Sequence, residues 1–96
     1  MKTKKLEEQA LFALGKIVAT QGAMSEIPAE DLLKGIVRHS QGDWGELCAA
    51  DRQENDFSLK HGYRLLSSYR SAQGIKFWVI TEYDRSCTTV LLPSEY

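Results

Sequence analysis

A chain of 96 residues, 43% hydrophobic and 26% charged, has room for one hydrophobic core, so we expect a single domain over residues 1–96. Twelve lysines and arginines against 13 acids leave a net charge of −1, which disfavours nucleic acid as a partner because binders of phosphate are commonly basic. No segment reaches the ~20 apolar residues of a membrane span, and no signal peptide is recognisable. These features predict a cytoplasmic protein.

The cysteines and histidines do not form a recognisable metal site. Cys48 and Cys87 lie far apart in the sequence and belong to no CxxC pair, which predicts two reduced, buried thiols. His39 and His61 are also widely separated, and neither lies at ligand spacing from a cysteine. The glycines match no phosphate-binding or dinucleotide-binding motif. We therefore expect neither a metal nor a cofactor.

Three helices are predicted in the first two thirds of the chain, from about residue 5 to residue 61. Apolar residues at spacings of three and four predict a long first helix that ends near Gly22. A second long helix should begin near Pro28 and end near His39, and a shorter third helix should run from about Ala50 to His61. The apolar stripe of the first helix comprises Leu6, Ala10, Ala13, Leu14, Ile17 and Val18, that of the second Leu32, Leu33, Ile36 and Val37, and Phe57 is the core residue of the third.

The last third of the chain predicts three strands, Tyr63–Arg70, Ile75–Glu82 and Cys87–Leu92, joined by two short turns. The expected fold is α+β, with N-terminal helices packed on a C-terminal three-stranded antiparallel meander over about residues 63–92. The middle strand is apolar on both faces. If the helices cover one face, either another segment or a partner has to cover part of the other.

One polar group surrounds the loop after the second helix. His39 and Asp43 could act as a general base and the carboxylate that orients it. The alternative is structural: a polar helix end, an aspartate that caps a turn, and a tryptophan packed beneath. We favour the structural interpretation because no nucleophile accompanies these residues. The group comprises His39, Asp43, Arg52 and Asn55, with Trp44 between them.

Two further groups could bind a ligand. Glu82, Asp84 and Arg85, with hydroxyls close by, could hold a polar ligand, although an ordinary turn explains the same residues. Basic and aromatic residues on the first predicted strand could form an RNA-binding face, although solvated arginines are the simpler interpretation. The candidate RNA site comprises His61, Arg64, Tyr69 and Arg70, flanked by Lys60, Lys76 and Trp78.

Several short motifs resemble a known group of proteins. They are Gly42-Asp43-Trp44-Gly45, the run Asp51-Arg52-Gln53-Glu54-Asn55, and an ending that reads WVITE, DRS, TTVLLP and EY between Trp78 and Tyr96. Together they resemble a family of small uncharacterised bacterial proteins carried on plasmids, phages and integrated elements, over roughly residues 29–96. The resemblance implies a mobile-element setting and brings no catalytic residues with it.

We consider three functions. The favoured one is a non-enzymatic protein-binding module of a mobile genetic element, an inhibitor, regulator or accessory factor that docks on another protein; a homodimer is also possible. The first alternative is a small ribonuclease-type toxin that uses the candidate RNA site. The second is a DNA-associated regulator, whose recognition helix would carry acids that repel phosphate. Candidate anchors for the favoured function are Trp44, Tyr69, Trp78, Tyr83, Asp84 and Arg85.

Overall fold

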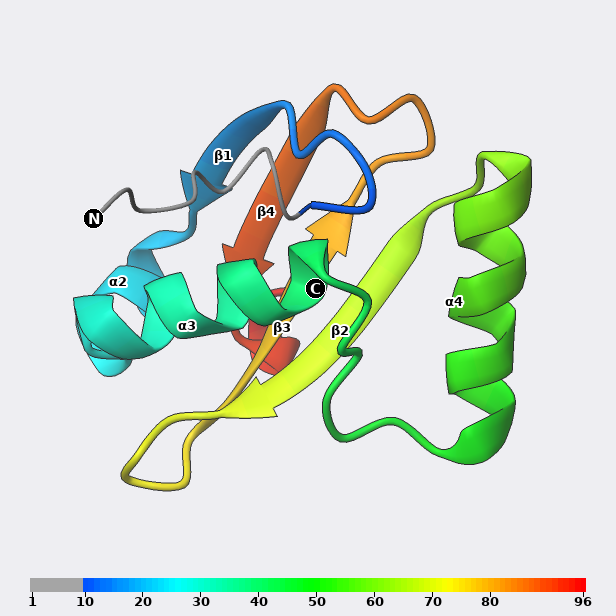
Figure 1. The fold of residues 1–96 in the computed structure, drawn as a ribbon. Helices are drawn as coiled ribbons and strands as arrows, with labels where there is room; N and C mark the ends of the chain where they lie inside the picture. Colours follow the sequence, from blue (N-terminus) through cyan, green and yellow to red (C-terminus); the bar gives the residue numbers. More distant parts are fainter. Residues whose placement is uncertain (1–9) are drawn as a thin grey trace, which may run out of the picture.

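Strands from the two ends of the described chain meet in one sheet, and the helices lie between them in the sequence (Figure 1). The computed structural model describes residues 10–96. The fold class is α+β. In chain order the elements are β1 (Lys16–Ala19), α2 (Gln21–Glu26), α3 (Ala29–Ser40), α4 (Ala49–His61), β2 (Leu65–Arg70), β3 (Lys76–Thr81), β4 (Cys87–Leu91) and a 3-10 turn, η1 (Pro93–Glu95).

The sheet contains four strands in the order β1-β4-β3-β2. β2, β3 and β4 pair antiparallel, so the three predicted strands and their order are confirmed. β1 pairs parallel with β4, in a register that places Ile17 beside Thr88. The prediction of a purely antiparallel C-terminal meander with every helix before it is therefore wrong: the sheet is mixed, and helices occupy the middle of the chain.

The predicted first helix is wrong where the structure describes it. Residues 10–15 are irregular and Lys16–Ala19 form β1, while residues 1–9 lie outside the described part. Gly15 has a φ of 65°, and a Cβ there would lie 2.3 Å from the carbonyl of Ser86. This close approach brings the β-branched Ile17 and Val18 onto β4. Gly22, expected to end a helix, lies inside α2 instead.

The other two predicted helices are confirmed within two residues at each end, as α3 and α4. Gly62 ends α4 in the left-handed conformation, with a φ of 78°. Gly35 lets α3 pack closely on the sheet, since a Cβ there would lie 2.7 Å from the ring of Phe77. Leu33 and Phe57 were expected in the core, but both are exposed.

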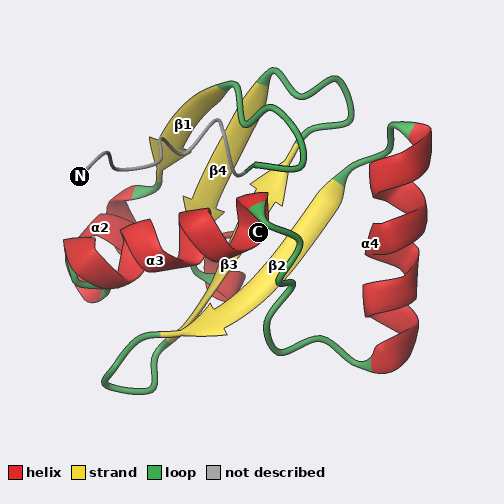
Figure 2. Ribbon diagram, in the orientation of Figure 1, coloured by secondary structure: helices red, strands yellow, loops and turns green. Residues whose placement is uncertain are grey.

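Different segments cover the two faces of the sheet (Figure 2). α3 lies across one face, against Tyr69 and Phe77. On the other face the ring of Tyr96 packs edge-on against Trp78, with centroids 5.6 Å apart. Glu95 holds this C-terminal turn in place because its carboxylate accepts hydrogen bonds from the hydroxyl of Thr20 and the N–H of Gly22. The described C-terminal turn thus covers part of the second apolar face.

Candidate functional site

His39 is fully buried between α3 and the sheet and belongs to a chain of polar groups. Its Nδ1 lies 2.6 Å from the hydroxyl of Ser67 on β2, and its Nε2 lies 2.8 Å from the hydroxyl of Thr81 on β3. The Thr81 hydroxyl lies 2.7 Å from that of Thr88, which donates to the carbonyl of Leu14. The chain therefore links α3, three strands and the N-terminal segment.

The Leu14 carbonyl can only accept a hydrogen bond, and this fixes which group donates in every other bond of the series. The Thr88 hydroxyl donates to the carbonyl of Leu14, so it must accept from Thr81. Thr81 then accepts from His39, which places the imidazole proton on Nε2, and Ser67 donates to Nδ1. His39 is thus a neutral imidazole with both ring nitrogens satisfied.

Burial is the main reason why the pKa of His39 is lowered to about 3, and the positive charge of Arg85 contributes in the same direction. The rings of Phe12 and Trp44 pack edge-on against the imidazole. The imidazole is therefore enclosed and neutral at neutral pH. This arrangement supports a role in folding, and no carboxylate of residues 10–96 is bonded to the ring.

The Gly42–Gly45 loop joins α3 to β2 and α4. Arg38 donates to Asp43 at 2.7 Å, and this hydrogen bond is the main reason why the pKa of the Asp43 carboxyl is lowered. The indole of Trp44 is buried, and its Nε1 donates to Asp56 on α4 at 2.9 Å. Gly45 approaches the backbone of β2 so closely that a Cβ would lie 2.0 Å from the carbonyl oxygen of Ser68.

The outer edge of β2 is closed by this loop and by Asn55 of α4. Ser68 N–H donates to the Trp44 carbonyl at 3.1 Å, and Glu46 N–H donates to the Ser68 carbonyl at 2.7 Å. Two residues earlier in β2, the Asn55 amide donates to the Leu66 carbonyl at 2.6 Å and accepts from the Leu66 N–H at 3.2 Å. The asparagine thereby takes the place of a neighbouring strand.

Asn55→Ala should destabilise the protein by about 2 kcal/mol, because it leaves both backbone groups of Leu66 without a partner. Urea unfolding measures the loss, and hydrogen exchange of the Leu66 amide should become faster. Gln53→Ala, at an exposed position of the same helix, is the control and should change stability by less than about 0.5 kcal/mol. Equal effects of the two substitutions would contradict the capping role.

Arg85 holds the turn between β3 and β4 against the end of α4. It has a φ of 62°, which is uncommon for a residue with a side chain. Its guanidinium also lies over the ring of Phe12. The donors of this side chain reach four carbonyls, those of Ser58, Tyr63, Glu82 and Tyr83.

In the polar turn predicted around Arg85, the side chains of Asp84 and Arg85 bond to different groups. The carboxylate of Asp84 accepts from the N–H and the hydroxyl of Ser86, and the hydroxyl is the main cause of the lowered pKa of Asp84. Arg85 points to the carbonyls of α4 and its neighbours, so the two side chains do not share a ligand site. Tyr83, in contrast, is exposed.

The candidate RNA residues do not converge. Tyr69 is buried, and its hydroxyl donates to the carbonyl of Asp43. Arg70 pairs with Glu46 at 2.9 Å, and Arg64 donates to the hydroxyl of Tyr96. His61 lies on α4, where its ring contacts that of Phe57 at a tilt of 35°. In the polar group predicted around the loop after the second helix, Arg52 is exposed on α4, while His39 is buried between α3 and the sheet.

An exposed aromatic cluster, which sequence analysis missed, lies at the C-terminal end of α4. It comprises Phe57, His61 and Tyr63: the centroids of Phe57 and His61 are 4.2 Å apart, and those of Phe57 and Tyr63 are 5.9 Å apart with nearly parallel rings. Phe57 is 51% exposed and Tyr63 55% exposed. The spacing of Phe57 and His61, four residues apart on a helix, was the available signal, but Phe57 was assigned to the core.

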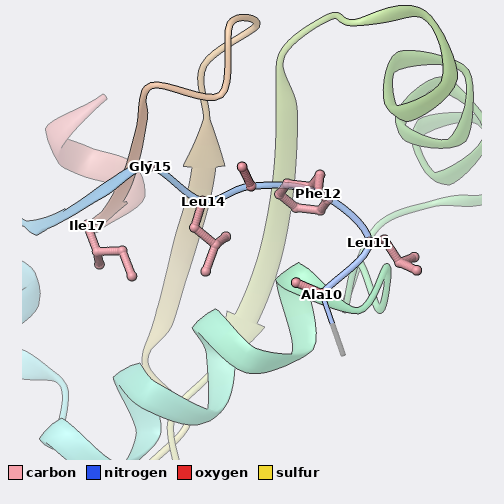
Figure 3. Close-up of a pocket in the computed structure, with 7 residues that line it drawn as sticks. Ala10, Leu11, Phe12, Leu14, Gly15 and Ile17 are labelled. Atoms are coloured by element: carbon pink, nitrogen blue, oxygen red, sulfur yellow. The ribbon is translucent and has the colours of Figure 1, made fainter. Parts of the chain in front are cut away.

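A hollow of about 540 Å³ lies along the N-terminal segment between Ala10 and Ile17 (Figure 3). Leu14 and Ile17 point to the same side of this segment, whereas Leu11 points away. Its described lining is apolar apart from the backbone.

Within residues 10–96, no three histidine, cysteine, aspartate or glutamate side chains gather as a metal site requires, and no helix is long and apolar enough to cross a membrane.

Both cysteines are free thiols. Cys87 is half-buried in β4, but Cys48, expected to be buried, is exposed at the N-cap of α4.

Comparison with protein-family models, with curated proteins and with solved structures finds no match for the chain.

Proposed function

We propose that this chain is a non-enzymatic protein-binding module that docks on another protein through the aromatic cluster of α4. The exposed rings of His61 and Tyr63, which both pack against the exposed ring of Phe57, carry the proposal. Aromatic side chains, tyrosine and tryptophan above all, are enriched among the anchors of protein interfaces, and they bury a large area with few rotatable bonds. The mobile-element setting rests on the motif resemblance alone.

The cluster lies on a rigid support. The N–H groups of Gly62 and Tyr63 both donate to the carbonyl of Ser58, which ends α4 in a fixed geometry. Arg85 binds the carbonyls of Ser58 and Tyr63 as well. A surface that is already ordered loses less entropy when a partner binds, which favours affinity. The backbone of Tyr83 is held beside Tyr63 by the same Arg85 nitrogen.

His39 and Asp43, the two residues considered for catalysis, make hydrogen bonds within the fold. His39 is enclosed with both nitrogens bonded, and Asp43 pairs with Arg38. The same is true of two proposed anchors, since Trp44 and Tyr69 are buried and bonded to neighbouring segments. Binding through exposed side chains therefore agrees better with the arrangement than chemistry at these polar groups.

The double variant Phe57→Ser, Tyr63→Ser should lose most of its partner binding, with capture from host lysate falling at least about tenfold. Leu33→Ser is the control, because it removes an equally exposed apolar side chain from α3. Both proteins should keep their thermal midpoints within about 5 °C of the unmodified chain. Capture is read by mass spectrometry after nuclease treatment.

Two results would overturn the proposal. One is equal capture by the double variant and the parent chain, which would remove the cluster from the interface. The other is capture that disappears on nuclease treatment, which would point to RNA or DNA as the bound molecule.

A further inference from the structure

Among the described residues, no segment pairs with the outer edge of β1, in contrast to the closed edge of β2. Lys16 N–H donates to the Ser86 carbonyl at 3.0 Å, and Thr20 N–H donates to the Val90 carbonyl at 2.9 Å. Backbone groups of alternate strand residues point to opposite sides, so those of Ile17 and Ala19 point away from β4. Within residues 10–96, no hydrogen bond reaches them. Two N–H and two C=O groups are thus free to pair with another strand.

We propose that a second copy of this chain occupies this edge, so that β1 pairs antiparallel with β1 of the second copy. The free groups are symmetric about Val18. With a two-fold axis at Val18, Ile17 of each copy lies opposite Ala19 of the other, and each such pair exchanges two hydrogen bonds. The two four-stranded sheets become one continuous sheet. This inference is independent of the aromatic cluster on α4.

The side chains along β1 favour a second copy over an unrelated peptide. Ile17 and Ala19 share the sheet face that α3 covers, because Ile17 pairs with Thr88. Ala19 is small, and a hollow of about 450 Å³ opens beside it, lined by Ala19, Gln21, Met24 and Ser25. The proposed register places the large Ile17 side chain of the second copy opposite Ala19, next to this hollow. Ile17 and Met24 are exposed in the single chain and would gain contacts there.

Sedimentation equilibrium over a concentration series should show a monomer–dimer equilibrium for the unmodified protein. Ala19→Pro should weaken the association constant by roughly tenfold or more, because proline removes an outward donor and its ring occupies the edge. The thermal midpoint at low concentration should stay close to that of the parent, since the Ala19 N–H makes no bond to any of residues 10–96. Val18→Pro is the contrasting variant: it removes a donor that faces β4 and should lower the thermal midpoint.

Chain mixing tests the register. Ile17→Lys and Ala19→Glu are each expected to dimerise weakly alone, whereas their mixture should form a heterodimer in which the lysine lies opposite the glutamate. A monomer at a concentration of about 1 mM would overturn the proposal. A dimer whose association constant Ala19→Pro leaves unchanged would also overturn it. The same holds for a monomer in which the amide chemical shifts of Ile17 and Ala19 change only when an alternating apolar peptide is added.

Discussion

Between pH 7 and pH 5 the protein should lose about 2 kcal/mol of its free energy of unfolding through His39 alone. The folded-state pKa is about 3 against 6.5 for a free histidine. As the pH falls below 6.5, the unfolded chain binds a proton that the folded chain does not, so stability decreases. The decrease ends near pH 3 and totals roughly 5 kcal/mol. The contribution is therefore fully present only above pH 6.5.

Urea unfolding at several pH values measures this loss. His39→Gln is the control, because its amide can still donate to Thr81 and accept from Ser67 but cannot be protonated. The variant should be less stable at pH 7 because its shape fits less well, yet its stability should change less between pH 7 and pH 5. Parallel curves for the two proteins would contradict a buried neutral His39. Nitrogen chemical shifts of the imidazole should show the proton on Nε2.

Gly45→Ala should destabilise the protein by at least about 3 kcal/mol, through two costs at one position. Gly45 has a φ of 77°, where a side chain is strained, and its Cβ would lie 2.0 Å from the backbone oxygen of Ser68. The oxygen belongs to β2 and cannot move without breaking the bond from Glu46 N–H. The edge of β2 and the adjoining loop should separate in the variant.

Gly74→Ala is the matched control. Gly74 also has a positive φ, 86°, but no atom of the described part of the chain lies within 4 Å of the position that a Cβ would take. Its alanine variant should lose only the strain of the left-handed conformation, about 1 kcal/mol. The difference between the two urea midpoints measures the cost of the clash. Equal losses would show that the loop can move away from β2.

The elements with strong local signals were predicted correctly. α3 and α4 begin and end near the expected residues, and the segments that became β2, β3 and β4 lie close together and pair through short turns. The prediction was wrong at Ile17 and Val18. Their spacing from earlier apolar residues also fits a helix, and the strand that decides the matter, β4, lies about seventy residues further along the chain.

The candidate residues were harder to interpret because their partners are remote in sequence. The sequence near His39 does not indicate that Ser67 and Thr81 bind its two nitrogens. The sequence near Asn55 likewise does not indicate that its amide pairs with Leu66. Phe57 shows the reverse error: an apolar residue on a helix was expected to be buried, but α4 presents that side to solvent. Burial depends on which neighbours a helix acquires, and these are tertiary contacts.

The pairing of β1 with β4 also governs when the domain can form during synthesis. A ribosome makes the N-terminal residues first, yet β1 has no strand beside it until Cys87–Leu91 has left the exit tunnel. By then the segments of α2, α3 and α4 have already emerged, without the sheet face on which they pack. Closing so long a loop is slow, so we expect the native state to form only after Cys87–Leu91 has emerged, as one late event.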